Sequence, residues 1–75
     1  MFYAIAKSGF HCTRYLTRMS RDGYVIETVA IYDDGSNPGD IWKARNFKTQ
    51  ASADKAIETL KQSGRDEFFI HQFAA

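Results

Sequence analysis

The sequence predicts an α+β fold, in which an antiparallel β-sheet of four to five strands carries one α-helix, at about residues 50–63, on one face. Three observations predict it. Short runs rich in β-branched and aromatic residues recur along the chain, one segment has apolar residues at helical spacing with a cap at each end, and turn-forming residues separate these segments. With 75 residues, the chain has room for one hydrophobic core, so we expect a single domain over residues 1–75.

The first half of the chain predicts a series of strands. Residues 2–7 form a short apolar run that ends at the turn residues Ser8-Gly9. Residues 11–21 fit two structures, because their apolar residues recur at helical spacing while alternate threonine and tyrosine residues favour a strand. The Asp22-Gly23 pair that follows is a strong hairpin signal, so the strand is the favoured interpretation.

The middle of the chain predicts a strand, a loop and a second strand. Residues 24–32 are almost entirely β-formers, and we expect this strand to lie in the centre of the sheet. Residues 33–40 collect turn-forming residues, including the single proline of the chain, and predict an exposed loop. Residues 41–47 predict a more polar strand at an edge, where Lys43 and Arg45 would discourage further pairing.

The last third predicts the helix and a closing strand. An apolar stripe runs through residues 50–63, Thr49 or Ser52 can cap its N-terminus, and Gly64 follows its last turn. Residues 67–73 predict a strand with apolar residues on both faces, so we expect one of its rings to remain near the surface or in an interface. Because one helix covers one sheet face, the other face must be solvated, covered by the chain itself or reserved for a partner.

Cysteine usage and hydropathy indicate the compartment. Cys12 is the single cysteine, which excludes an intramolecular disulfide, and the chain does not open with a charged and then apolar leader. We therefore expect a cytoplasmic protein. No apolar run approaches the roughly 20 residues that cross a bilayer, so no association with a membrane is expected.

The sequence offers little material for catalysis or for a cofactor. His11 is adjacent to Cys12, but neighbours in a strand point to opposite faces, which leaves the distant His71 as the remaining base for a cysteine nucleophile. One cysteine and two histidines fall short of a zinc site, and residues 33–40 lack the alternating ligands of a calcium loop. No glycine-rich phosphate loop is present. We expect no enzymatic activity, no metal and no cofactor.

Charge is strongly segregated although the formal net charge is only +1. Residues 1–21 contain four basic and no acidic side chains, whereas residues 22–40 contain five acidic and no basic ones. This separation predicts opposed charged patches that could steer a partner. The alternative is that the two blocks neutralise each other on adjacent strands.

Two kinds of partner follow from these patterns. The predicted contact surface combines six basic and aromatic residues, Arg14, Arg18, Arg21, Trp42, Lys43 and Arg45. An alternative contact surface is the acidic loop with Asp33, Asp34 and Asp40. Cations interleaved with rings suit a nucleic acid, for which Tyr15 and Lys48 would also contribute. Exposed apolar surface on so small a chain suits a protein partner or a homodimer formed through an edge strand or the bare sheet face.

One segment resembles a known group of proteins. Residues 43–49, Lys-Ala-Arg-Asn-Phe-Lys-Thr, lead into the apolar stripe Ala53, Ala56, Ile57 and Leu60. This passage resembles the strand-to-helix passage of short accessory proteins of phages and mobile elements, anti-CRISPR inhibitors among them. The resemblance implies a function by stoichiometric obstruction of a larger host protein or nucleoprotein complex.

The sequence therefore predicts a small non-enzymatic protein-binding module, and the resemblance implies an inhibitor of a host defence complex of the CRISPR-Cas kind that acts by steric obstruction. The alternative is a single-stranded or duplex nucleic-acid-binding protein that uses a basic and aromatic face.

Overall fold

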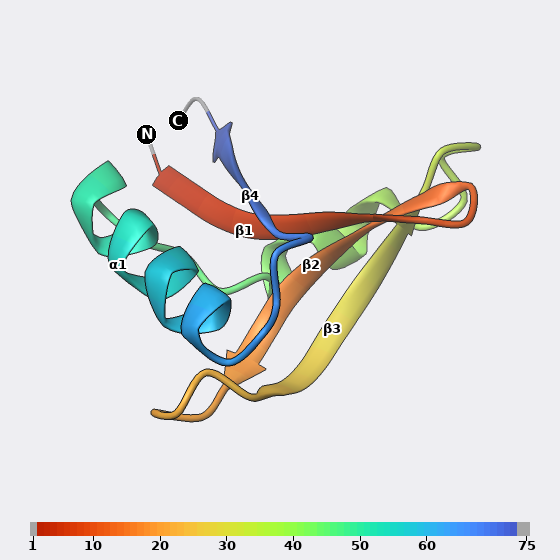
Figure 1. The fold of residues 1–75 in the computed structure, drawn as a ribbon. Helices are drawn as coiled ribbons and strands as arrows, with labels where there is room; N and C mark the ends of the chain where they lie inside the picture. The colour runs from red at the N-terminus through yellow and green to blue at the C-terminus, as the bar shows by residue number, and fades with distance from the viewer. Residues whose placement is uncertain (1, 74–75) are drawn as a thin grey trace.

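The computed structural model describes residues 2–73 and confirms the α+β fold (Figure 1). Four strands form one antiparallel sheet in the order β3-β2-β1-β4, and one main helix packs on it. The elements are β1 (Phe2–Gly9), β2 (Cys12–Met19), β3 (Val25–Tyr32), the 3-10 helix η1 (Pro38–Lys43), α1 (Gln50–Gln62) and β4 (Phe69–Phe73).

The first two connections are β-hairpins. Residues 12–19 are a strand, as the favoured interpretation predicted, and the Asp22-Gly23 turn joins it to β3. The turn predicted at Ser8-Gly9 lies two residues later, because Gly9 still pairs with Cys12. The connection is therefore the pair Phe10-His11, and His11 takes a φ of 54°, the left-handed conformation that so tight a turn requires.

The predicted central position of the strand at residues 24–32 is wrong, because β3 is an edge strand of the sheet. Two of its apolar residues, Val29 and Ile31, pack with Ile41 of η1 in one cluster, whereas Ile26 and Tyr32 are 56% and 46% exposed. Its outer edge is partly closed by Asn37, whose side-chain oxygen accepts a hydrogen bond from the Tyr32 N–H at 2.9 Å. The Asn37 amide nitrogen donates to a backbone carbonyl of the same strand, which blunts the edge against further pairing.

The predicted strand at 41–47 is also wrong. The 3-10 helix η1 continues to Lys43, and the extended segment that follows forms a single bridge, between Phe47 and Tyr3, with N···O distances of 2.9 and 2.8 Å. The pairing of β1 with β2 extends from Gly9 opposite Cys12 to Ala6 opposite Tyr15, and the extended segment lies past this last pair. There the Arg45 N–H donates to the Leu16 carbonyl at 2.9 Å.

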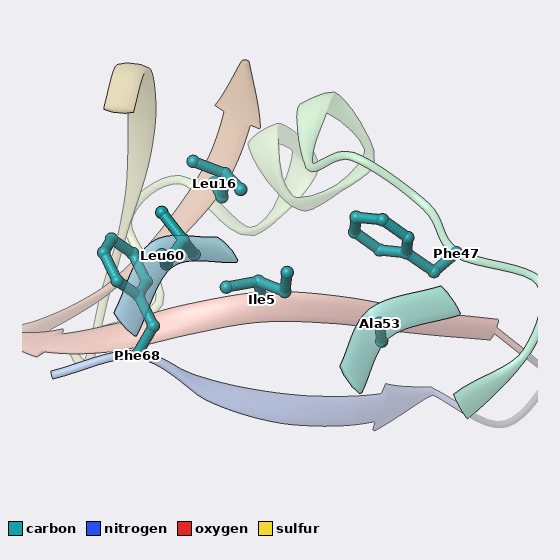
Figure 2. Packing of buried hydrophobic residues seen from close by; sticks show 6 residues of the cluster. All are labelled: Ile5, Leu16, Phe47, Ala53, Leu60 and Phe68. Carbon is teal, nitrogen blue, oxygen red and sulfur yellow. The ribbon is translucent and has the colours of Figure 1, made fainter. Parts of the chain in front are cut away.

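The two sheet faces bury two clusters. Consecutive strand residues point to opposite faces, and accordingly Tyr15 and Leu16 belong to different clusters. On the α1 side the buried residues are Ile5, Leu16, Phe47, Ala53, Leu60 and Phe68 (Figure 2). On the other side they are Ala4, Ala6, Tyr15 and Ala44. The face without α1 is thus partly covered by the chain itself.

The helix has the predicted caps. Thr49, rather than Ser52, is the N-cap, and its hydroxyl oxygen accepts a hydrogen bond from the Ser52 N–H at 3.2 Å. Gly64 follows the C-cap with a φ of 89°, and its N–H donates to the Lys61 carbonyl at 3.0 Å. Both ends of α1 are therefore fixed by local contacts.

Candidate anion-binding cleft

A cleft of about 610 Å³ lies between the β2–β3 hairpin, residues 45–48 and α1. Its lining consists of Met19, Ser20, Arg21, Arg45, Asn46, Phe47, Lys48, Ser52, Lys55, Ala56 and Thr59. Four of these residues are cations and, within residues 2–73, none of the lining residues is a carboxylate. We call this site the basic cleft.

Each wall of the basic cleft contributes at least one cation. Arg21 comes from the hairpin, Arg45 and Lys48 from the segment before α1, and Lys55 from α1 itself. All four side chains are exposed, so their charges face solvent and any ligand that enters. Because no carboxylate lies among them, the site attracts anions.

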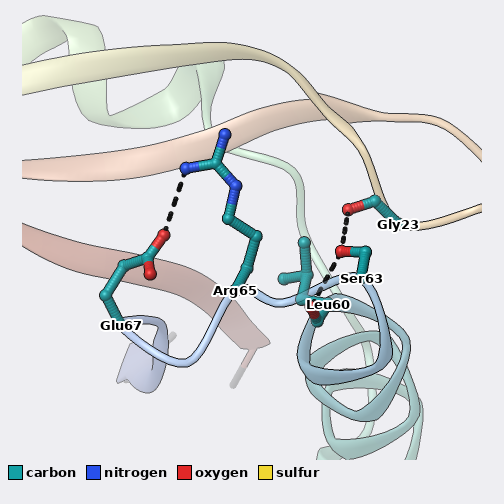
Figure 3. Close-up of polar contacts among 5 residues, drawn as sticks. All are labelled: Gly23, Leu60, Ser63, Arg65 and Glu67. Carbon is teal, nitrogen blue, oxygen red and sulfur yellow. Dashed lines mark hydrogen bonds and ion pairs between the residues drawn. The ribbon is translucent and has the colours of Figure 1, made fainter.

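A close contact between the hairpin and α1 holds the wall that carries Arg21. Gly23 has a φ of 86°, and a Cβ at this position would lie 2.6 Å from the Thr59 carbonyl oxygen, so only glycine allows this approach. The Ser63 hydroxyl lies 2.9 Å from the Gly23 carbonyl oxygen and 2.8 Å from that of Leu60 (Figure 3). Figure 3 also shows the exposed pair Arg65–Glu67, at 3.4 Å, on the segment that follows the helix.

Arg45 is oriented by an aromatic ring. Its guanidinium carbon lies 5.1 Å from the centroid of the Phe47 ring, which is a cation–π contact. Phe47 is itself only 8% exposed and belongs to the core on the α1 side. The ring therefore gives the Arg45 side chain a fixed support at the wall of the cleft.

The structure separates the six residues predicted as one contact surface. Arg21 and Arg45 line the basic cleft, and Arg14, Arg18, Trp42 and Lys43 do not. Arg14 donates a hydrogen bond to Thr28 at 3.3 Å on the neighbouring strand, and Arg18 lies opposite Glu27 at an irregularity in strand pairing.

The other two predicted residues lie on η1. Trp42 is 81% exposed, and Lys43 lies 3.4 Å from Asp40 in an exposed ion pair. Lys55 lines the basic cleft but is not among the residues predicted as a contact surface from the sequence. Its spacing of three residues from Ser52 and four residues from Thr59 was the available signal for a shared helix face.

The acidic loop is organised by its own contacts. The Asp34 carboxylate accepts a hydrogen bond from the Ser36 N–H at 2.9 Å, and this backbone hydrogen bond lowers the pKa of Asp34. Asp33 and Asp34 line a second, smaller hollow of about 460 Å³ with His11 and Tyr32. None of the three predicted acidic residues, Asp33, Asp34 and Asp40, lines the basic cleft.

A row of aromatic rings occupies the β1–β4 side of the face opposite α1. Phe73 stacks on Phe2 at 4.9 Å and on His71 at 4.2 Å between ring centroids, and the Tyr15 hydroxyl lies 3.0 Å from His71 Nδ1. Burial raises the pKa of Tyr15 above its ordinary value. Because these rings stack on one another, they offer few free ring faces. Phe69, 44% exposed, is the ring of β4 that remains near the surface.

Cys12 and His71, the residues considered above as nucleophile and base, have separate contacts in the structure. Cys12 is buried, and His71 contacts Tyr15 rather than the thiol. Within residues 2–73, no group of three or more His, Cys, Asp or Glu side chains could hold a metal ion. In the same range, no helix has the length and apolar character needed to cross a membrane.

No family model matches this chain, and neither a curated protein nor a solved structure matches it.

Proposed function

We propose that this chain is a non-enzymatic binding module that engages a nucleic acid through the basic cleft. One observation carries the proposal: of the described residues, four cations line the cleft and no carboxylate does. Phosphate groups are the anions that such a set of exposed lysine and arginine side chains neutralises. The acidic loop lines a different hollow and leaves this charge uncompensated at the cleft.

The salt dependence of affinity gives a quantitative expectation. Each cation that neutralises a phosphate contributes on the order of 0.7 to 0.9 to the slope of log K against log salt concentration. Four cations that each meet a phosphate predict a slope of about −2.8 to −3.6, and three predict about −2.1 to −2.7. Affinity should fall steeply between about 50 and 200 mM salt, as it does for other proteins that contact phosphates.

Two substitutions on α1 provide a matched test. Lys55 lines the cleft, whereas Lys61, on the same helix, does not. The measurement is fluorescence anisotropy of labelled 15-nucleotide single strands and duplexes at several salt concentrations. Lys55→Gln should reduce the slope by about 0.7 to 0.9, and Lys61→Gln should leave it unchanged. If no oligonucleotide binds at 20 mM salt, or if both variants behave alike, the proposal is wrong.

A second candidate function is favoured by a different residue. Trp42 is 81% exposed on η1, outside the basic cleft, and tryptophan is the residue type most enriched at protein–protein hot spots. On this proposal the chain obstructs a larger protein or nucleoprotein complex, as an inhibitor of the anti-CRISPR kind.

The test for this second function is capture of partners by the tagged protein from host lysate, with and without nuclease. A stoichiometric protein that survives nuclease and is lost with Trp42→Ala supports it. Recovery that depends entirely on nucleic acid, and that Trp42→Ala does not change, contradicts it.

A further inference from the structure

The basic cleft has an apolar floor beneath its charged rim. Among its lining residues Phe47 is buried and Met19 and Ala56 are half-buried, whereas all four cations are exposed. A phosphate backbone can reach the rim of such a site. The bases of a duplex are stacked inside the helix and cannot reach the floor, whereas an unpaired base can.

Arg45 supplies a surface for stacking. Its guanidinium carbon lies 5.1 Å from the centroid of the Phe47 ring, and the residue is exposed. Guanidinium planes and aromatic rings are the groups on which proteins stack unpaired bases. The cation–π contact with this ring restrains the Arg45 side chain before a ligand arrives, which reduces the entropy lost on binding.

We infer that the basic cleft binds single-stranded nucleic acid and receives one unpaired base. The inference rests on the proposed function and narrows it. The base stacks on the Arg45 guanidinium above Met19 and Ala56, while Arg21, Lys48 and Lys55 neutralise phosphates on the rim. The volume of about 610 Å³ lies within the roughly 300–1,000 Å³ of pockets that hold small organic groups. Recognition by stacking tolerates any base, so little sequence preference is expected.

The decisive variant keeps the positive charge at residue 45 and removes the planar guanidinium. Arg45→Lys retains a cation but cannot stack as a guanidinium does. It should weaken binding of a labelled 15-nucleotide oligothymidine by about tenfold, within the range measured for single base-stacking contacts, and leave the salt slope unchanged. Binding of a 15-base-pair duplex should change less than twofold. The control is Arg18→Lys, an exposed arginine outside the cleft, which should change neither affinity.

A second pair of variants tests the floor. Ala56→Met fills it, and Ala51→Met adds the same side chain at an exposed position of α1 outside the cleft. Only the first should weaken single-strand binding, by about tenfold, with circular dichroism confirming that both variants are folded.

The outcomes separate the two proposals. If single strand and duplex bind with equal affinity, and neither Arg45→Lys nor Ala56→Met changes it, the proposed insertion of a base is wrong. Phosphate binding at the cleft then still stands. No binding of either oligonucleotide overturns both proposals. Tighter binding of poly-glutamate than of any oligonucleotide also overturns both and assigns the cleft to an acidic protein.

Discussion

Gly23 joins the hairpin that carries Arg21 to the end of α1, and replacing it by alanine should destabilise the fold in two separable ways. Its φ of 86° costs an L-residue about 1–2 kcal/mol. The new Cβ would also lie 2.6 Å from the Thr59 carbonyl oxygen and 3.1 Å from its carbonyl carbon. A backbone carbonyl in a helix cannot rotate away, so the hairpin or the helix end must shift, and overpacking of this kind costs about 1–3 kcal/mol.

The chain contains a control that isolates the second contribution. Gly35 has a φ of 77°, and an added Cβ would meet nothing within 4 Å, so Gly35→Ala pays the backbone cost alone. Urea denaturation of both variants, followed by circular dichroism, measures the difference. Gly23→Ala should lose about 2–5 kcal/mol and Gly35→Ala about 1–2 kcal/mol. Equal losses would show that the hairpin does not press on α1, and the proposed positioning of Arg21 would fail with it.

Two further predictions concern the helix cap and the aromatic row. Thr49→Ala removes the acceptor for the Ser52 N–H and should lower the free energy of unfolding by about 1 kcal/mol. Thr49→Ser keeps a hydroxyl acceptor and should retain most of this stabilisation. Urea denaturation of both variants measures the difference. Because burial raises the Tyr15 pKa, the unfolded chain loses this proton at lower pH than the folded one, so stability should fall as pH rises from about 10. Tyr15→Phe should flatten that fall in urea midpoints taken at pH 8 and 10.5, and an unchanged pH dependence would contradict the assignment.

The strands and the helix could be predicted where local chemistry decides them. The caps Thr49 and Gly64 fix α1 through contacts within a few residues, and the Asp22-Gly23 turn fixes the pairing of its flanking strands. The position of β3 could not be read in this way. Part of its apolar surface is covered by η1 and part is exposed, and such a strand has the same composition as one flanked by two other strands.

The prediction of a strand at residues 41–47 was wrong for a related reason. The residues of this segment favour extended structure locally, but most of its contacts are distant in sequence: Ile41 packs against β3, Arg45 bonds to Leu16 and Phe47 pairs with Tyr3. The segment can pair with Tyr3 and Leu16 because the β1–β2 pairing ends at Ala6 opposite Tyr15. No local pattern reports where a pairing ends, so tertiary contacts determine this segment.

The basic cleft depends on two contacts between residues that are distant in sequence, which is why its cations could be predicted only in part. The Tyr3–Phe47 bridge places Arg45 and Lys48, and the Gly23–Thr59 approach places Arg21 near Lys55. The formal net charge of +1 conceals the result, because no residue of the acidic block lines the cleft, although Asp22 directly follows Arg21 in the chain. Exposed carboxylates farther away than the roughly 8–10 Å Debye length are largely screened at physiological salt, so the charges that line the cleft and adjoin it act most strongly on a bound anion. The charge that decides which partner binds is therefore the local one, and it is set by packing rather than by composition.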